Sequence, residues 1–253
     1  MADLRDKCPP DTRHFSNVPR DRVRIGDDDH VTSDLSHWSG APRPQRIVLD
    51  GRYARLEPLA IERHEAQLFA SAREPGAEAR FAYLFDTPPA DARAFRTWME
   101  TAVSTDDPLF FAVVDMATGR AEGRQALMRI DPAHGVIEVG HILWGPAIAR
   151  TRVATEALYL MAEHVFADLG YRRLEWKCHH RNEPSRRAAA RFGFTFEGIF
   201  RQHMVAKGQN RDTVWFSIVD SEWPALKAGY QRWLAPENFD AQGQQRQRLE
   251  GLR

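Results

Sequence analysis

Residues 136–169 constrain the fold of this chain more than any other stretch, because a strand pattern and a helix pattern follow each other directly there. Residues 136–143 are dense in β-branched and aliphatic side chains, and Gly140 interrupts them, which is typical of a strand with a local irregularity. From Ala154 to Leu169, apolar residues recur at spacings of three and four, which predicts one face of a helix. We therefore expect the chain to fold around a strand, a short turn and a long amphipathic helix.

The turn between this strand and this helix carries Arg150, Thr151 and Arg152. The start of a helix exposes backbone N–H groups and a partial positive charge, so arginines beside it favour a phosphate-binding position. A basic helix start that only faces solvent is the alternative that these residues leave open.

The composition favours one folded domain with a sizeable core. The chain has 253 residues, and 43% of them are apolar. The 35 basic residues balance the 35 acidic ones, so the bulk charge gives no argument for binding nucleic acid or an anionic membrane. No apolar run approaches the roughly 18 residues that span a bilayer, and the N-terminus lacks the apolar core of a secretory signal. We therefore expect a cytoplasmic protein.

Three segments differ in composition. Residues 1–45 hold clustered charge, scattered prolines and no sustained period, which predicts a flexible N-terminal extension, with Trp38 the residue most suited to anchor it. Residues 46–235 carry the periodic segments and form the predicted domain. Residues 236–253 form a Gln-rich, polar C-terminal tail that we expect to be disordered.

Within the predicted domain, strand and helix patterns alternate. Strands are expected at residues 52–59, 109–115, 126–130, 136–143, 173–179, 196–205 and 213–219, and helices at residues 61–72, 90–103, 154–169 and 183–192. Residues 81–85 fit neither pattern clearly. This order predicts an α/β protein with a mixed sheet and helices on its faces.

Several short motifs occur in a characteristic order: EVGH at residues 138–141, TEA at 155–157, Asn182-x-x-Ser185 ahead of Gly193-Phe194, and EGIFR at 197–201. These motifs lie in and after the central strand, turn and helix, and their order and spacing resemble those of the GNAT superfamily of acyl-CoA-dependent N-acyltransferases. Within that superfamily, residues 47–225 look most similar to the ribosomal-protein N-terminal acetyltransferase-like branch. The resemblance implies an α/β (α+β) fold with a mixed, mostly antiparallel sheet of about seven strands, helices on both faces, and acetyl-CoA as co-substrate.

The resemblance also implies where acetyl-CoA binds. The family's phosphate loop aligns with residues 149–154, where Ala154 keeps a small residue, Arg152 replaces the middle glycine and Ala149 replaces the leading Gln or Arg. In the family, the pantetheine arm lies along the central strand, whose backbone N–H groups can polarise the thioester carbonyl. The implied cofactor-binding residues are Val139, Gly140, Ile142, Arg150, Thr151, Arg152, Val153, Ala154, Thr155, Asn182 and Ser185.

Three residues are candidates for proton transfer. Glu138 and His141 are three positions apart on a strand, so we expect them to point to opposite faces and not to share one substrate. The family often keeps an acidic base on a strand, which favours Glu138, whereas an unperturbed pKa near 6.5 favours His141. Ser185 lies one turn before Ala189, which occupies the position of the family's usual Tyr acid, so the resemblance assigns proton donation to Ser185. The alternative is that these residues are structural, with Asn182 and Ser185 only capping their helix.

The remaining polar features point to no further chemistry. His179, His180 and His203 lack the spacing of metal ligands, so no metal site is expected. Cys8 and Cys178 lie far apart in sequence and suggest no disulfide framework. The polar turn at residues 207–212 and Arg201 either border the acceptor site or form a solvated hairpin tip.

The function implied by the resemblance is transfer of an acetyl group from acetyl-CoA to a primary amine by direct attack in a ternary complex. The acceptor would be a small molecule or a protein N-terminus, and the protein a monomer or a homodimer. A catalytically weak acyl-CoA-binding sensor or scaffold is the alternative, favoured by the altered loop and the missing Tyr. A mixed-sheet protein that binds no cofactor is a third, weaker interpretation.

Overall fold

A computed structural model describes residues 34–253 of the chain. The predicted flexibility of residues 1–33 and the prediction for Cys8 lie outside the described residues. Residues 34–38 contain a turn in which the Trp38 N–H donates to the Leu35 carbonyl at 2.9 Å, and the anchoring role of Trp38 stays a prediction. The description below concerns residues 39–253, which form one unit.

The centre of this unit is an eight-stranded sheet in the order β1-β2-β3-β4-β5-β6-β8-β7. Every neighbouring pair is antiparallel except β5 and β6, which confirms the predicted mixed, mostly antiparallel sheet. The additional strand is β1, whose two residues are too short to leave a periodic pattern. The strands are β1 (Leu49–Asp50), β2 (Ala54–Pro58), β3 (Leu109–Asp115), β4 (Arg120–Asp131), β5 (Val136–Trp144), β6 (Arg173–His179), β7 (Thr195–Ala206) and β8 (Gln209–Val219).

The helices include the four that were predicted and two that were not. The predicted helices are α1 (Ile61–Arg73), α3 (Ala92–Ser104), α4 (Arg152–Glu163) and α5 (Glu183–Phe192), and α4 continues into a π-helical turn, η2 (His164–Asp168). The additional helices are α2 (Ala77–Phe81) and α6 (Trp223–Leu234), followed by the 3₁₀ turns η3 (Pro236–Asn238) and η4 (Leu249–Gly251). None of the helices in residues 34–253 combines the length and the apolar character needed to cross a bilayer.

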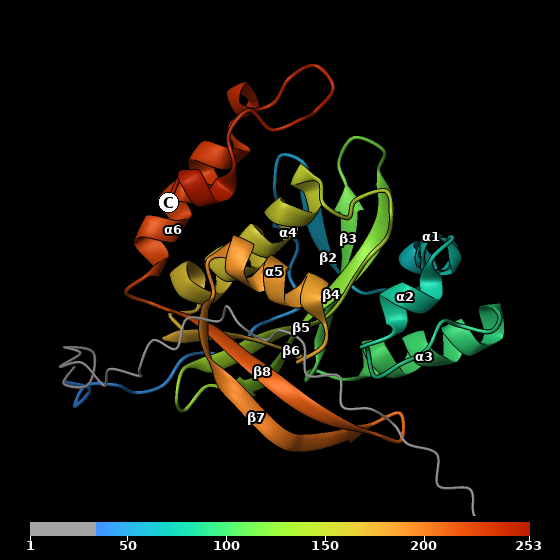
Figure 1. Ribbon diagram of the computed structural model, residues 1–253, viewed down its shortest axis with the longest axis horizontal. Helices are drawn as coiled ribbons and strands as arrows, with labels where there is room; N and C mark the ends of the chain where they lie inside the picture. The colour runs from blue at the N-terminus through green and yellow to red at the C-terminus, as the bar shows by residue number, and fades with distance from the viewer. Residues whose placement is uncertain (1–33) are drawn as a thin grey trace, which may run out of the picture. The chain divides into compact units, whose positions relative to one another are not determined.

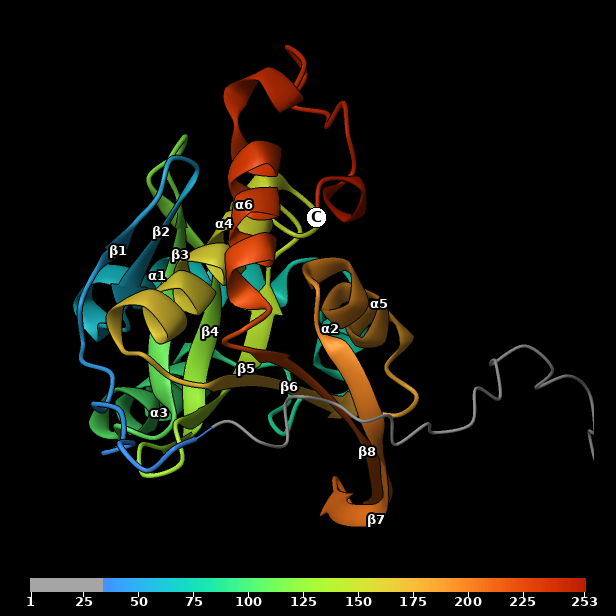
Figure 2. The same cartoon turned by 90° about the vertical axis from the view of Figure 1, so that its left-hand side faces the viewer.

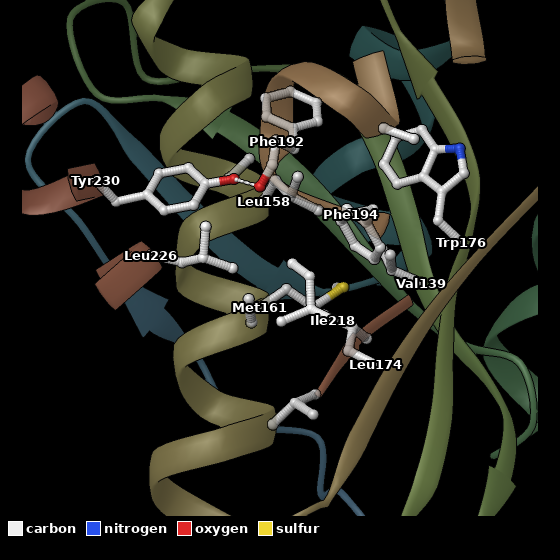
Figure 3. Close-up of a cluster of buried hydrophobic side chains, with 14 of the residues drawn as sticks. Val139, Leu158, Met161, Leu174, Trp176, Phe192, Phe194, Ile218, Leu226 and Tyr230 are labelled. Carbon is white, nitrogen blue, oxygen red and sulfur yellow. Dashed lines mark hydrogen bonds between the residues drawn. The ribbon is translucent and has the colours of Figure 1, made fainter. Parts of the chain in front are cut away.

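The helices cover both faces of the sheet, as predicted (Figures 1 and 2). Alternation along β3 divides the core, because Phe111 and Val113 pack on the side of α4 whereas Phe110 and Ala112 pack on the side of α1 and α3. On the first side, α4 and α6 lie next to each other and α5 packs on β6 and β7. Figure 3 shows this larger core, in which the Tyr230 hydroxyl donates to the Phe192 carbonyl at 2.9 Å.

The C-terminal segment is ordered, so the prediction of a disordered tail is wrong. Leu249 is fully buried, Phe239 is buried, and the Asn238 side chain donates to the Trp233 carbonyl at 2.9 Å. At the end of the chain, the Arg253 guanidinium donates to the Arg191 carbonyl at 2.9 Å. The few apolar residues of this segment are separated by polar ones, so their shared burial against α5 and α6 arises only from tertiary packing.

Candidate active site

The site begins where β5 and β6 separate. These two parallel strands pair only from Val136 to Glu138 on β5 and from Arg173 to Glu175 on β6. Beyond these residues each strand continues, β5 to Trp144 and β6 to His179, without further pairing between them. The backbone N–H and C=O groups that face the split are therefore available to an extended ligand, which can bind there as a strand would.

A β-bulge at His141 and Ile142 reshapes the open part of β5. Between β4 and β5, Ala126 pairs with Gly140 and Arg124 pairs with Leu143, so β5 carries one extra residue in this interval. His141 has a left-handed φ of 50°, and its ring lies 5.1 Å from that of Phe110, on the face covered by α1 and α3.

The bulge brings Glu138 and His141 into one pocket, so the prediction that they point to opposite faces is wrong. The strict alternation of a strand fails there because the bulged residue rotates the side chains that follow it. Ile142 also changes side and packs, with Val139, on the face of α4.

A cavity of about 1060 Å³ lies at the start of α4. Its wall includes the whole predicted phosphate loop, residues 149–154, and Thr155 after it, together with Arg187 and Arg191 of α5. Thr151 is the N-cap of α4, because its hydroxyl accepts from the Val153 N–H at 3.1 Å and donates to the Ile148 carbonyl at 2.7 Å. The first-turn residues of α4 and five arginines, Arg52 among them, line this cavity, which suits a polyanion such as a nucleotide diphosphate.

The two arginines of the loop differ in their surroundings. Arg150 is exposed and has a left-handed φ of 64°. The Arg152 guanidinium lies over the rings of Tyr53 and Phe239, at 4.3 and 5.3 Å from their centroids. The ring contacts hold Arg152 at the cavity wall without neutralising its charge, so both arginines can meet phosphate.

Thr155 and Glu156 of the TEA motif have different neighbours. The Thr155 hydroxyl accepts from Arg191 at 3.1 Å, so Thr155 links α4 to the arginine of α5. Glu156 is buried, and its carboxylate accepts from the backbone N–H groups of Arg52, Tyr53 and Ala54. Glu156 therefore fastens the start of β2 to α4 and is not part of the cavity wall.

A second pocket, of about 80 Å³, opens in the split between β5 and β6. From β5 it is lined by the predicted residues Glu138, Val139, Gly140, His141 and Ile142, and from β6 by residues 176–179. The segment that follows α2 contributes Phe85, and the start of α5 contributes Asn182. Sequence reasoning therefore found the β5 side of this pocket.

Glu138 is held between two cations. It is 4% exposed, and its Oε2 lies 2.6 Å from Arg129 Nη1 and 3.0 Å from Lys177 Nζ. Arg129 is itself at a bulge of β4, with a φ of 47°, and the Asp107 carboxylate accepts from its backbone N–H at 2.8 Å. Both ion pairs hold the Glu138 carboxylate at the wall of the pocket.

His141 is neutral at pH 7. Burial, followed by the charge of the nearby Arg124, lowers its pKa to about 4. Arg124 is itself buried in an ion pair with Asp86 and lies 4.2 Å from the centroid of the Trp98 ring. The imidazole therefore has an unprotonated nitrogen, but it is a weaker base than a solvent-exposed histidine.

Asn182 and Ser185 both make hydrogen bonds that stabilise the fold around the start of α5. The Asn182 carboxamide oxygen accepts from the Ser185 N–H at 3.2 Å, which makes Asn182 the N-cap of α5. The Ser185 hydroxyl accepts from Trp176 Nε1 at 3.0 Å and also lies beside the Cys178 thiol, whose pKa burial raises. Asn182 lines the pocket, whereas Ser185 does not line it and contacts two residues that do, Trp176 and Cys178. Ala189, at the position of the family's Tyr, is fully buried.

Sequence reasoning missed Lys177, which lines the pocket from β6, and Tyr53 and Phe239, which line the larger cavity. Their periodicity marks them only as strand or tail residues, and no local signal places them at a site. Arg211 lines the pocket from β8 and belongs to the turn at residues 207–212, for which the sequence left open the edge of an acceptor site or a solvated hairpin tip. Among residues 34–253, no three His, Cys, Asp or Glu side chains are grouped so that they could hold a metal ion.

Comparison with known proteins gives the same family as the motifs. The family description "Acetyltransferase (GNAT) domain" matches residues 55–195. A GCN5-related N-acetyltransferase from Brucella melitensis, solved by crystallography, is 60% identical with a TM-score of 0.85, over 86% of this chain and 99% of that one. An uncharacterized N-acetyltransferase, p20, from Bacillus licheniformis is 28% identical over 117 residues, which span 45% of this chain and 63% of that protein's length.

The neighbours also include the branch suggested by the motifs. The crystal structure of an acetyl transferase from Salmonella typhimurium that modifies the N-terminal serine of ribosomal protein L7/L12 is 15% identical, with a TM-score of 0.60 over 68% of this chain and 99% of that one. At this identity the likeness shows a shared fold alone. The family description, in contrast, matches more than half of the chain, and the split strands and the helix start stand where the motifs predict them. This chain therefore belongs to the GNAT family of N-acetyltransferases.

Proposed function

We propose that this protein transfers an acetyl group from acetyl-CoA to a primary amine that attacks the thioester while both are bound. Membership of the GNAT family implies an acyl-CoA co-substrate and an amine acceptor. The observation that carries the proposal is the split between β5 and β6, because β5 lines the smaller pocket with residues 138–142 and the arginine-rich cavity with Trp144. Two reactants can therefore meet along one strand.

The cofactor-binding roles follow from this geometry. Arg150, Arg152 and the first-turn amides of α4 are proposed to bind the diphosphate, with Val153, Ala154 and Thr155 forming the turn around it. The free edge of β5, at Val139, Gly140 and Ile142, is proposed to bind the pantetheine arm, with Asn182 on the opposite side. Backbone N–H groups of this edge would stabilise the negative charge that develops on the thioester oxygen.

The proton-transfer roles are assigned to three side chains. The attacking amine must lose a proton, and Glu138 and His141 both line the pocket where it would stand. Ser185 is proposed to donate a proton to the leaving sulfur, because its bond with Trp176 uses the hydroxyl oxygen as acceptor and not its hydrogen. The acetyl group passes directly from sulfur to nitrogen, so the N–C bond forms as the C–S bond breaks, and no covalent enzyme intermediate is needed.

The test measures two quantities: the melting temperature of the protein and the release of free CoA thiol from acetyl-CoA. Acetyl-CoA should raise the melting temperature, and adding a pool of amines should accelerate thiol release. S185A and E138Q should each slow turnover roughly tenfold or more, because each removes one proton-transfer group, while acetyl-CoA still stabilises the variant. H141Q, measured beside E138Q, identifies which group accepts the proton. Loss of acetyl-CoA binding in S185A or E138Q would contradict the assigned roles.

A catalytically weak acyl-CoA-binding module is the second candidate. It is favoured by Ala189, which leaves no phenolic acid on α5, and by the two ion pairs that occupy Glu138. This candidate predicts thermal stabilisation by acetyl-CoA and no acceleration of thiol release by any amine. The thiol assay therefore separates the two candidates.

A further inference from the structure

Arg211 is a buried arginine whose side chain makes no hydrogen bond or ion pair with any other residue of 34–253. It lies on β8, is 7% exposed, and lines the pocket between β5 and β6. Its Nε is fully buried without a partner, and its guanidinium carbon lies 4.8 Å from the centroid of the Phe85 ring. A buried guanidinium that lacks a counterion is costly, so a partner supplied from outside the chain would offset that cost.

The other charges around this pocket are already matched. Glu138 pairs with Arg129 and Lys177, and Lys177 also pairs with Glu175 at 2.6 Å. Burial lowers the pKa of His141 to about 4, so that ring carries no charge at pH 7. Among the charged residues around this pocket, Arg211 therefore differs from the others: in residues 34–253, no carboxylate lies within hydrogen-bond distance of its guanidinium.

The co-substrate does not supply the missing anion. The arginines that suit its phosphates line the other cavity, at the start of α4, and Arg211 is not part of that wall. The pantetheine arm and the thioester, which would lie along β5, carry no negative charge in the bound state. An anion that reaches Arg211 must therefore arrive with the acceptor.

We propose that the acceptor amine carries a carboxylate, and that Arg211 binds this carboxylate and so orients the amine toward the thioester. The inference rests on the proposed acetyl transfer and narrows its acceptor to an amino acid or to a peptide N-terminus with a nearby acidic side chain. A guanidinium binds a carboxylate through two parallel N–H···O bonds, which fixes orientation as well as position. Polyamines and other purely cationic amines would meet an unpaired positive charge and are excluded as preferred acceptors.

The first experiment compares acceptors that differ only in the carboxylate. Thiol release from acetyl-CoA is measured with the common L-amino acids, with their amides, and with the peptide amides Ala-Glu-NH2 and Ala-Gln-NH2. If the acceptor is a free amino acid, kcat/KM should be about tenfold or more higher for the amino acids than for their amides. If it is a peptide N-terminus, kcat/KM should be higher by a similar factor for Ala-Glu-NH2 than for Ala-Gln-NH2. The two arms distinguish a free amino acid from a peptide. Equal rates for the charged and neutral acceptors in both arms would overturn the inference.

The second experiment tests Arg211 itself, with R201Q as the matched control. Arg201, which the sequence left as a possible neighbour of the acceptor site, is an exposed arginine of β7 and lines neither pocket, so R201Q makes the same chemical change away from Arg211's pocket. R211Q should raise KM about tenfold for the preferred carboxylate acceptor, change kcat little, and leave neutral amides unaffected, whereas R201Q should change neither constant. An equal fall of kcat for acidic and neutral acceptors would mean that Arg211 acts on the reacting atoms, and would overturn the assignment.

Stability gives a readout that does not depend on turnover. Because the Arg211 side chain has no hydrogen-bond or ion-pair partner among the described residues, and contacts only the Phe85 ring as a cation, R211Q should not lower the melting temperature, whereas a structural arginine should lower it when removed. The N-acetylated form of the preferred acceptor should stabilise the wild-type protein, and its amide should not. If no amine accelerates thiol release although acetyl-CoA binds, the proposed transfer and this inference both fail. If neutral amines react equally well, only this inference fails.

Discussion

The His141 side chain illustrates how one backbone conformation sets both the position and the charge of a residue. Its φ of 50° belongs to the bulge that turns the ring toward Phe110 and into the pocket with Glu138. The same position buries the ring beside Arg124, and burial first and Arg124 second disfavour the protonated form. A residue with an ordinary pKa near 6.5 thereby becomes neutral throughout the physiological range.

This lowered pKa predicts that stability falls in mild acid. Between pH 6.5 and about 4, the unfolded chain protonates His141 while the folded chain does not, so the free energy of unfolding rises with pH across this window. The part of the free energy of unfolding that depends on a neutral His141 is fully present above pH 6.5 and is lost as the pH approaches 4. It amounts to at most about 3 kcal/mol. Urea unfolding of the wild type and of H141Q between pH 4 and 7 checks this, because H141Q should lose less stability on acidification. Parallel curves would contradict the assignment.

At the scale of elements, α4 is held by its own carboxylate as well as by its apolar face. Glu156 lies one turn from the start of the helix and accepts from three consecutive backbone N–H groups at the beginning of β2. The turn before β2 also brings Tyr53 against Arg152, so this contact positions the wall of the larger cavity. The TEA motif therefore joins an element of the fold to the site.

We predict that E156Q lowers the free energy of unfolding by about 2 kcal/mol or more, because a neutral amide replaces charge-assisted bonds and brings a buried NH2 next to N–H donors. E100Q, the same change at an exposed position of α3, should cost less than about 0.5 kcal/mol. Chemical denaturation of both variants measures the difference. Similar losses in the two variants would show that Glu156 does not fasten β2 to α4.

At the scale of the whole molecule, the C-terminal segment completes both the core and the cavity. Leu249 is fully buried, and Phe239 packs against Trp233 and Tyr53 with ring centroids 5.0 and 5.8 Å apart. Phe239 also lines the larger cavity and lies beside the Arg152 guanidinium. The last residues of the chain thus form part of the proposed acetyl-CoA site, far in sequence from the motifs that identify it.

L249A should lower the free energy of unfolding by about 2–5 kcal/mol, because the substitution leaves a cavity at a fully buried position. V205A, on β7, removes apolar atoms from a side chain that is 79% exposed and should change stability by less than about 0.5 kcal/mol. Thermal and urea unfolding of both variants tests the contrast. A stable L249A variant would mean that the segment does not contribute to the core.

The sequence by itself determined the order of most strands and helices, the place where α4 begins to within two residues, and the residues of β5 that line the split. These features follow from local periodicity and from side-chain-to-backbone bonds between near neighbours, such as Thr151 with Val153. It did not reveal α6 or the packing of the C-terminal segment, because their apolar residues acquire a common face only against the rest of the core.

Only the tertiary structure decided which way the site residues face and what surrounds them. The bulge turned His141 onto the side of Glu138, although alternation in a regular strand predicts the opposite. Arg211 is one basic residue of a hairpin in the sequence, and it becomes a buried, unpartnered charge only because β8, β6 and the segment after α2 converge on it. Periodicity records which side of an element is apolar, whereas the charge balance of a pocket depends on residues that the chain brings together from distant positions.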